Sequence, residues 1–229
     1  MEFTLLAAAA IAGAAAYIML WWEAKHGNAA RCTGNLWEIG LVSTVAGIFI
    51  GRIVAMLVDG VNPIAHPMDV ILVRSGVSTV GASLGAAAVF AVQARKNTIT
   101  IADGISAAAL AGLAGWHAGC LVRGSCLGTA SDLPWAIAQE GSTVTRHPVG
   151  IYAALLLAIA AIGLAWWKAY RRPPEGSPAA IAVIAAAGIR LATEPFQPSI
   201  SGGPVWFYAT ALVAGIGVLA WSIVRRKTA

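Results

Sequence analysis

The sequence predicts an all-α integral membrane protein with seven transmembrane helices, and three observations support this fold class. Hydrophobic residues make up 59% of the 229 residues and charged residues only 11%, whereas soluble proteins contain about half and about a quarter. The apolar residues form runs of about 20, the length that an α-helix needs to cross a bilayer. Lysine and arginine concentrate in alternate connections between these runs, as they do in cytoplasmic loops.

Each apolar run predicts one helix. The predicted helices cover residues 3–22, 39–59, 69–93, 99–121, 148–168, 178–193 and 204–224. They leave no room for a separate soluble domain, so residues 1–229 are expected to form a single polytopic membrane domain. We expect the first helix to be retained, because residues 1–4 contain no basic side chain and the apolar run exceeds the roughly 7–15 residues of a signal-peptide core.

The basic residues predict the orientation of the helices. Ten of the fifteen follow the first, third, fifth and seventh predicted helices: Lys25, Arg31, Arg95, Lys96, Lys168, Arg171, Arg172, Arg225, Arg226 and Lys227. Because such connections stay in the cytoplasm, the N-terminus is expected outside and the C-terminus inside. This asymmetry and contact with anionic lipid headgroups account for the net charge of +5, which therefore does not indicate a nucleic-acid partner.

The other five basic residues lie inside predicted helices or in the outer loops. They are Arg52, Arg74, Arg123, Arg146 and Arg190. An arginine at the centre of an isolated span costs roughly 2.5–3.5 kcal/mol or more, so it needs a compensating partner. One interpretation is an ion pair, since Glu194 follows Arg190 by one helical turn. The other is that several arginines bind a phosphate group, whose oxygens fit the guanidinium. The small number of acidic residues favours phosphate binding for at least two of the five.

The three outward-facing connections differ in character. Residues 61–69 form a short connection in which His66 is expected to be solvated. Residues 194–204 are rich in proline, glycine and serine and form either a lid or a turn. Residues 122–147 form the longest loop, a type of segment that often carries function, and Trp135 within it also fits an interfacial anchor. The alanine and glycine runs of the helices are expected to serve close helix packing alone.

Several motifs in these segments resemble those of one known family. SDLPW (131–135) followed by RHPVGIY (146–152) resembles the TDLPW and RHPxQLYE motifs of the prolipoprotein diacylglyceryl transferases. HAGCLVRGSCLG (117–128) resembles the GRxGNFxxGExYG block of that family. GIRLATEPFQP (188–198) resembles its late Arg-x-x-x-Glu element, and IGRIVAML (50–57) its early Gly-Arg element. The family also has seven helices with the N-terminus outside, and the chain is identified by this resemblance as a divergent member.

The resemblance implies a bacterial inner-membrane enzyme whose active site faces the outer leaflet or the periplasm. Such an enzyme transfers the diacylglyceryl group of phosphatidylglycerol to the lipobox cysteine thiol of a prolipoprotein and releases glycerol phosphate. No cofactor or metal is expected. The residues expected to act in the reaction are His117, Arg146, Arg190 and Glu194. Those expected to bind substrate are Arg123, His147, Gly119, Gly124, Gly128, Ser125, Cys120, Arg52, Arg74 and Tyr152.

The sequence departs from the family pattern at positions that matter for proton transfer. In STVGAS (78–83), Val80 stands where the family has its catalytic histidine. His117 takes the place of the signature arginine, Cys120 that of the asparagine and Ser125 that of the glutamate. Because imidazole gains and loses a proton near neutral pH, we expect His117 to act as the base or as a phosphate ligand that depends on its protonation.

The cysteines and His147 leave alternatives open. Cys120 and Cys126 lie on the side expected to be oxidising. They could form a disulfide, bind a metal with His117, remain small buried thiols or include a covalent nucleophile. Cys32 is expected to be a reduced thiol in a cytoplasmic loop. His147 either contacts substrate or belongs to a turn that starts a helix with proline in its first turn.

Three functions are compatible with these residues. The first is lipidation of prolipoproteins with phosphatidylglycerol as donor. The second keeps the phospholipid donor but uses another acceptor, which would explain the missing histidine. The third is non-catalytic lipid binding or transport. We expect the first, because His117 or His147 can supply a base.

Overall fold

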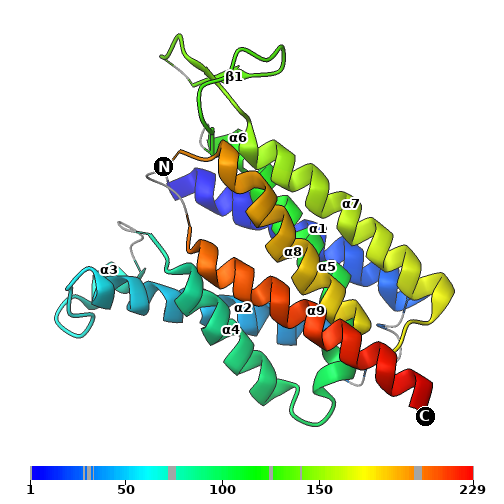
Figure 1. Cartoon of the computed structure of the whole chain (residues 1–229). Coiled ribbons are helices and arrows are strands. Elements are labelled where there is room, and N and C mark those ends of the chain that lie inside the picture. The colour runs from blue at the N-terminus through cyan, green and yellow to red at the C-terminus, as the bar shows by residue number, and fades with distance from the viewer. Residues whose placement is uncertain are drawn as a thin grey trace. The chain divides into compact units, whose positions relative to one another are not determined.

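The computed structural model describes residues 2–27, 29, 32, 34–71, 76–123, 126–139, 141–198 and 203–228. The longer helices are α1 (Glu2–His26), α2 (Leu36–Val58), α4 (Thr79–Gln93), α5 (Thr98–Ala118), α7 (Val149–Arg171), α8 (Ser177–Thr193) and α9 (Val205–Thr228) (Figure 1). The short elements are α3 (Pro67–Ile71), α6 (Cys120–Arg123), the 3-10 helix η2 (Glu194–Phe196) and the strands β1 (Ile137–Ala138) and β2 (Thr145–Arg146).

The predicted all-helical membrane class is confirmed. Within the described ranges, six helical segments are long and apolar enough to cross a membrane: α1, α2, α5, α7, α8 with η2, and α9. The region expected as one helix over 69–93 differs, because residues 76–78 are not helical and α4 starts afresh at Thr79. The hydroxyl of Ser78 accepts a hydrogen bond from the Gly81 amide at 3.2 Å and so caps the new helix. At 15 residues, α4 is about 22 Å long.

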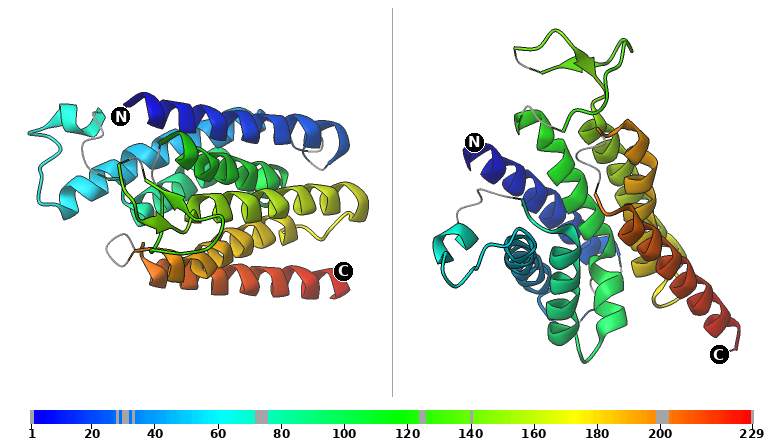
Figure 2. Two further views of the ribbon diagram at one scale, coloured as in Figure 1. Left: turned by 90° about the horizontal axis from the view of Figure 1, so that it is seen from above. Right: turned by 60° about the vertical axis from the view of Figure 1, so that its left-hand side comes forward.

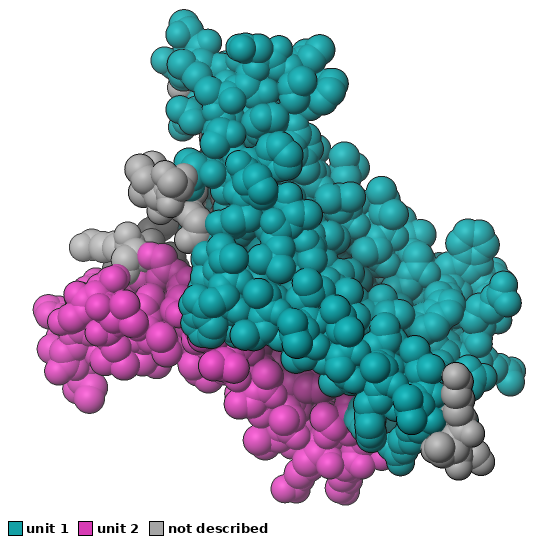
Figure 3. Space-filling view, in the orientation of Figure 1, with its two compact units in different colours: residues 1–32, 99–229 teal, residues 33–98 magenta. Residues whose placement is uncertain are grey.

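The chain forms two compact units, which Figure 3 colours separately: residues 33–98, and residues 1–32 with 99–229. In the first, α2 and α4 pack antiparallel through glycines. A Cβ at Gly47 would lie 2.7 Å from the Ala82 carbonyl oxygen, and one at Gly81 would lie 2.8 Å from the Val54 Cβ. The small residues therefore allow the two helix backbones to approach closely, as expected from the sequence.

Arg52 is buried within this same unit, where it bonds to backbone carbonyls. Its Nε and Nη2 donate to the Asp69 carbonyl oxygen at 3.0 and 2.7 Å, and its Nη1 donates to the Gly76 carbonyl oxygen at 3.0 Å. These bonds connect α2 to Asp69 of α3 and to Gly76, which precedes α4. The guanidinium thus supports the local backbone, a role that differs from the substrate contact expected for Arg52.

In the larger unit, α5, α7 and α8 enclose the hydrophobic core, and α8 packs between α7 and α9 (Figure 2). The core includes Leu110 of α5, Leu157 and Leu164 of α7, and Ala182 of α8. Helix α1 packs closely on α5, since a Cβ at Gly115 would lie 2.8 Å from the Ala12 Cα. The end of α5, the start of α7 and the end of α8 meet at one end of this unit, beside α6 and the β1–β2 hairpin (Figure 1).

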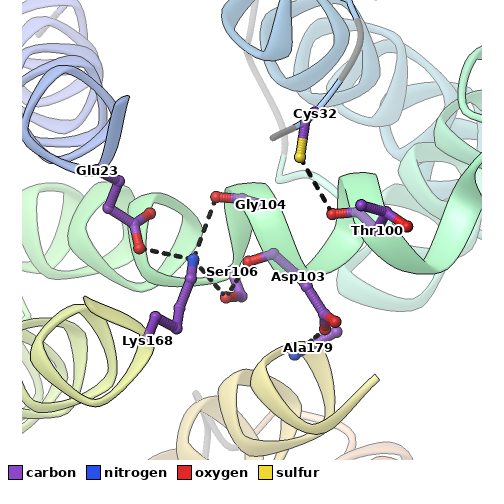
Figure 4. A network of polar contacts seen from close by, with 8 residues as sticks. All are labelled: Glu23, Cys32, Thr100, Asp103, Gly104, Ser106, Lys168 and Ala179. Carbon is purple, nitrogen blue, oxygen red and sulfur yellow. Dashed lines mark hydrogen bonds and ion pairs between the residues drawn. The ribbon is translucent and has the colours of Figure 1, made fainter. Parts of the chain in front are cut away.

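The opposite end of this unit contains a buried polar network (Figure 4). The Lys168 Nζ lies 2.6 Å from the Glu23 carboxylate, and both side chains are fully buried. Lys168 also donates to the Gly104 carbonyl oxygen and the Ser106 hydroxyl, each at 3.2 Å. This network satisfies the ammonium group, and so Lys168 is buried within α7 instead of lying in the expected cytoplasmic loop.

The carboxylate of Asp103 in this network caps α8. It accepts hydrogen bonds from the Gly176 amide at 2.7 Å and the Ala179 amide at 3.0 Å. Gly176 precedes the helix and has no side chain with which to cap it. A residue of α5 therefore satisfies the first amides of α8.

We predict that Lys168→Met lowers the free energy of unfolding by roughly 3–5 kcal/mol, because it leaves the buried Glu23 carboxylate without its cation. Unfolding of the purified protein in detergent measures this loss. Adding Glu23→Gln to Lys168→Met should restore much of the stability. Lys25→Met, which removes an exposed cation of α1, is the matched control and should change stability far less. An equal loss for both lysine variants would contradict the prediction.

Candidate functional site

A chain of backbone hydrogen bonds joins the loop after α6 to α7 and η2. The Gly128 amide donates to the His147 carbonyl oxygen at 2.7 Å, and the His147 amide donates to the Thr129 carbonyl oxygen at 3.0 Å. The Thr129 amide donates to the Phe196 carbonyl oxygen at 2.8 Å. A Cβ at Gly128 would overlap the Phe196 carbonyl oxygen and the Val149 side chain. Only glycine fits this junction between three segments.

Arg146 lies beside this junction, at the end of the hairpin. Ile137 of β1 pairs with Arg146 of β2, and the Arg146 Nη1 donates to the Gly128 carbonyl oxygen at 3.2 Å. The other N–H groups of this guanidinium have no partner among the residues that the structure describes. Arg146 is therefore held in place by one bond and keeps donors that can bind an anion.

A cavity of about 280 Å³ lies between the end of α5, the start of α7 and the end of α8. Its lining residues are Trp116, His117, Cys120, Cys126, Leu127, Val149, Gly150, Ala153, Arg190, Gln197 and Pro198. Three of the residues predicted for the site, His117, Cys120 and Arg190, thus come together on one cavity surface. Trp116 directly precedes the HAGCLVRGSCLG motif and Gln197 lies within GIRLATEPFQP, but neither was predicted as a site residue.

Cys120 and Cys126 form a disulfide. This bond decides among the alternatives that the sequence left open, because neither sulfur is a free thiol that could bind a metal or attack a substrate. Cys120 is buried in α6, whereas Cys126 is exposed and lies in the following loop. The disulfide therefore forms part of the cavity wall, as do Arg190 and Gln197.

Arg190 is surrounded by partners from η2, from the residue after it and from α9. Its Nη1 forms an ion pair with Glu194, and its Nη2 donates to the Gln197 Oε1 at 3.0 Å. Its guanidinium also lies 5.2 Å from the ring centroid of Tyr208. The expected ion pair at this i,i+4 spacing is confirmed. Glu194 thus compensates the charge of Arg190, whereas Arg146 has no carboxylate partner among the residues that the structure describes.

An aromatic cluster covers the first turn of α7. The Trp135 indole donates to the Tyr152 hydroxyl at 2.8 Å, and this hydroxyl lies 3.4 Å from the His147 Nδ1. The His147 ring also packs against Phe196, with 5.0 Å between ring centroids. The outer loop is thus attached to α7 by side chains of the two motifs SDLPW and RHPVGIY. His147 and Tyr152 lie next to Arg146 but do not line the cavity.

The remaining predicted residues lie elsewhere. A Cβ at Gly119 would overlap Ala8 of α1, so this glycine serves helix packing. Arg52 belongs to the other unit. Arg74, Gly124, Ser125 and the side chain of Arg123 lie outside the described residues.

The fold and the cavity define a multi-pass membrane protein with cationic side chains and an imidazole at one end of a helical bundle. Residues 2–226 match the sequence model of the prolipoprotein diacylglyceryl transferases. The chain belongs to this family.

Curated relatives with the name phosphatidylglycerol–prolipoprotein diacylglyceryl transferase are bacterial. The relative from Bordetella avium is 28% identical over 193 residues, which cover 80% of this chain and 73% of the relative. The relative from Methylobacillus flagellatus is 26% identical over 220 residues, or 90% of this chain and 83% of the relative. The relative from Legionella pneumophila is 29% identical over 199 residues, or 84% and 78%. Similarity therefore extends over most of the chain.

We predict that Gly128→Ala lowers the free energy of unfolding by roughly 1–3 kcal/mol, since the new methyl group overlaps the backbone of η2. Thermal unfolding in detergent measures the effect. Gly163→Ala is the matched control, because a Cβ at that position in α7 meets nothing within 4 Å. If the two variants unfold alike, the junction around Gly128 is not as tightly packed as described.

Proposed function

We propose that this protein is a membrane-embedded transferase that moves the diacylglyceryl group of phosphatidylglycerol to the cysteine thiol of a prolipoprotein. Its family and the names of its relatives support the reaction class. The observation that carries the proposal for this chain is the cavity that presents the His117 imidazole and the Arg190 guanidinium on one surface, with Arg146 close by.

The reaction requires one bond to form and one to break. The acceptor sulfur bonds to the carbon of the diacylglyceryl group that carries the phosphate. The bond between this carbon and the phosphate oxygen breaks at the same time. The thiol loses its proton, and glycerol phosphate leaves with the electron pair of the broken bond. The protein must therefore supply a base for the thiol and cations for the leaving phosphate.

His117 is the proposed base. It lines the cavity, and imidazole is suited to accept a proton near neutral pH. The family histidine is replaced by Val80 in α4, which leaves this role to another residue. The same replacement favours the alternative in which the phospholipid donor is kept but the acceptor is not a prolipoprotein.

Arg146 is the proposed main ligand of the phosphate, and Arg190 supports it. The free donors of Arg146 suit phosphate oxygens. Arg190 shares its charge with Glu194, so we assign it to positioning the headgroup and Glu194 to orienting Arg190. Arg123, His147 and Tyr152 are proposed as further contacts near the headgroup.

We also propose seven membrane spans, with the N-terminus outside, the C-terminus in the cytoplasm and the cavity at the outer leaflet of the bacterial inner membrane. The distribution of basic residues supports this orientation. So does the disulfide at the cavity, since disulfides persist on the oxidising side of the membrane. The α3–α4 region supplies the proposed seventh span.

We expect Arg146→Ala and Arg190→Ala to lower kcat/KM by about 10- to 100-fold, because each removes charge-assisted hydrogen bonds worth about 1.5–3 kcal/mol. The assay incubates purified protein with phosphatidylglycerol and a lipobox peptide, and follows peptide mass and released glycerol phosphate. Arg171→Ala, at the exposed far end of α7, is the matched control. Full activity in both site variants would exclude the phosphate role, and glycerol phosphate without lipidated peptide would indicate another acceptor.

We expect His117→Gln to lower kcat by about 10²- to 10⁴-fold, the typical contribution of a general base. Binding of phosphatidylglycerol, measured by native mass spectrometry, should remain close to that of the unmodified protein. A loss of binding with little change in kcat would instead assign His117 to the phosphate.

A further inference from the structure

We propose that the Cys120–Cys126 disulfide is a positioning element of the active site, which holds the 126–131 loop so that Arg146 and the cavity wall are correctly placed. The catalytic part of this proposal rests on the function proposed above. Its structural part concerns the loop alone and can be tested without turnover.

The disulfide closes a short loop, since its cysteines are six residues apart. A crosslink restricts the unfolded chain less when the loop that it closes is shorter. Its contribution to global stability is therefore small, and its main effect is local. The local structure that it restrains includes the cavity lining on both sides of the bridge, namely His117 before it and Leu127 after it.

The bridge packs against the first turn of α7 at Gly150. A Cβ at Gly150 would lie 2.9 Å from the Cys120 Cβ and 3.1 Å from the Cys120 Sγ. The Gly150 amide also donates to the Cys126 carbonyl oxygen at 3.3 Å. The disulfide thus packs the start of α6 and the loop after it against the first turn of α7, through a contact that only glycine allows.

Cys126 itself has a backbone φ of 68°, in the left-handed region that residues other than glycine rarely adopt. Such a conformation persists when the surrounding structure imposes it. The covalent bond to Cys120 and the hydrogen bond from the Gly150 amide both restrain this position, so we expect Cys126 to relax towards an ordinary conformation when the disulfide is opened.

A conformational change at Cys126 is expected to move Arg146, because Gly128 lies between them in the hydrogen-bonded structure. Two residues after Cys126, the Gly128 carbonyl oxygen accepts the bond from the Arg146 Nη1, and the Gly128 amide donates to His147. The donors of Arg146 proposed to bind phosphate are therefore placed by a loop that the disulfide fixes. Reduction should weaken donor binding while it leaves the helical bundle folded.

The experiment compares the unmodified protein with Cys32→Ser and with the double variant Cys120→Ser/Cys126→Ser, each with and without dithiothreitol and after reoxidation with oxidised glutathione. Hydrogen exchange of the amides of residues 128–131 reports the loop independently of activity. Phosphatidylglycerol binding and the split between KM and kcat report the site. Cys32 is a suitable control because its thiol donates to the Thr100 carbonyl oxygen of α5 (Figure 4) and because burial raises the pKa of this thiol, which favours its protonated form.

In the unmodified protein and in Cys32→Ser, reduction should speed exchange of these amides and raise the KM for phosphatidylglycerol by about 10-fold, as expected for the loss of one charge-assisted contact. The kcat should change less, the melting temperature should fall by no more than about 5 °C, and reoxidation should reverse both effects. The double variant should show the amide exchange and KM of the reduced protein, and adding the reductant should change neither.

Unchanged amide exchange on reduction would overturn the proposal whatever the activity. Faster exchange with unchanged phospholipid binding and KM would overturn the link to Arg146. If no transfer is detected in any state, the proposed function fails, but exchange and phosphatidylglycerol binding still decide whether the disulfide positions the loop. The reductant arm uses the folded unmodified protein, so the test stands even if the double variant does not fold.

Discussion

Hydrogen bonds from cationic side chains to backbone carbonyl oxygens hold the polar parts of this protein in place. Arg52 bonds to the carbonyl oxygens of Asp69 and Gly76, Lys168 to that of Gly104 and Arg146 to that of Gly128. Each of these cations therefore serves two purposes, since it satisfies a carbonyl oxygen and is itself stabilised by the hydrogen bond. Within the described ranges, Lys168 and Arg190 also have carboxylate partners.

This arrangement explains why two arginines near the cavity differ in character. Arg190 has a carboxylate, an amide oxygen and an aromatic ring as partners, whereas Arg146 bonds to a single carbonyl oxygen among the residues that the structure describes. A cation whose charge is balanced within the protein is rigid but attracts an anion weakly. A cation with spare donors can bind the substrate, provided that the backbone around it is firmly held. The hydrogen bonds around Gly128 and the Cys120–Cys126 disulfide hold this backbone in place.

Much of the fold could be predicted from the sequence, because an apolar run of about 20 residues is long enough to cross a bilayer and is uncommon in soluble proteins. The break before α4 could not, since it involves the Ser78 cap and a hydrogen bond from Arg52 to Gly76, and Arg52 lies 24 residues earlier in the sequence. The burial of Lys168 in α7 was not predicted for a related reason. Its partner Glu23 lies 145 residues away in the sequence, and no local pattern connects the two residues.

The sequence predicted the site residues that lie close together in one motif. It did not predict those that only tertiary packing brings together. RHPVGIY indicated Arg146, His147 and Tyr152 together, and the structure keeps them adjacent. Gln197 and Tyr208 reach Arg190 from the end of a 3-10 helix and from α9, and no spacing rule connects these positions. The pairing of Cys120 with Cys126 was one of several alternatives, because a spacing of six residues does not by itself distinguish a disulfide from two free thiols.

The cap that Asp103 provides for α8 fixes where this helix begins, and therefore how far along the helix axis Arg190 lies from α5. Asp103 fixes the first amides of α8 from a neighbouring helix, and Arg190 lies 13 residues beyond Ser177, or about 20 Å along the axis. The position of the Arg190 guanidinium therefore depends on the number of residues between the capped start of α8 and Arg190. One residue inserted into it would move the guanidinium by about 1.5 Å and turn it by about 100°, away from Gln197, so the length of this helix is as much a requirement of the site as any side chain that lines it.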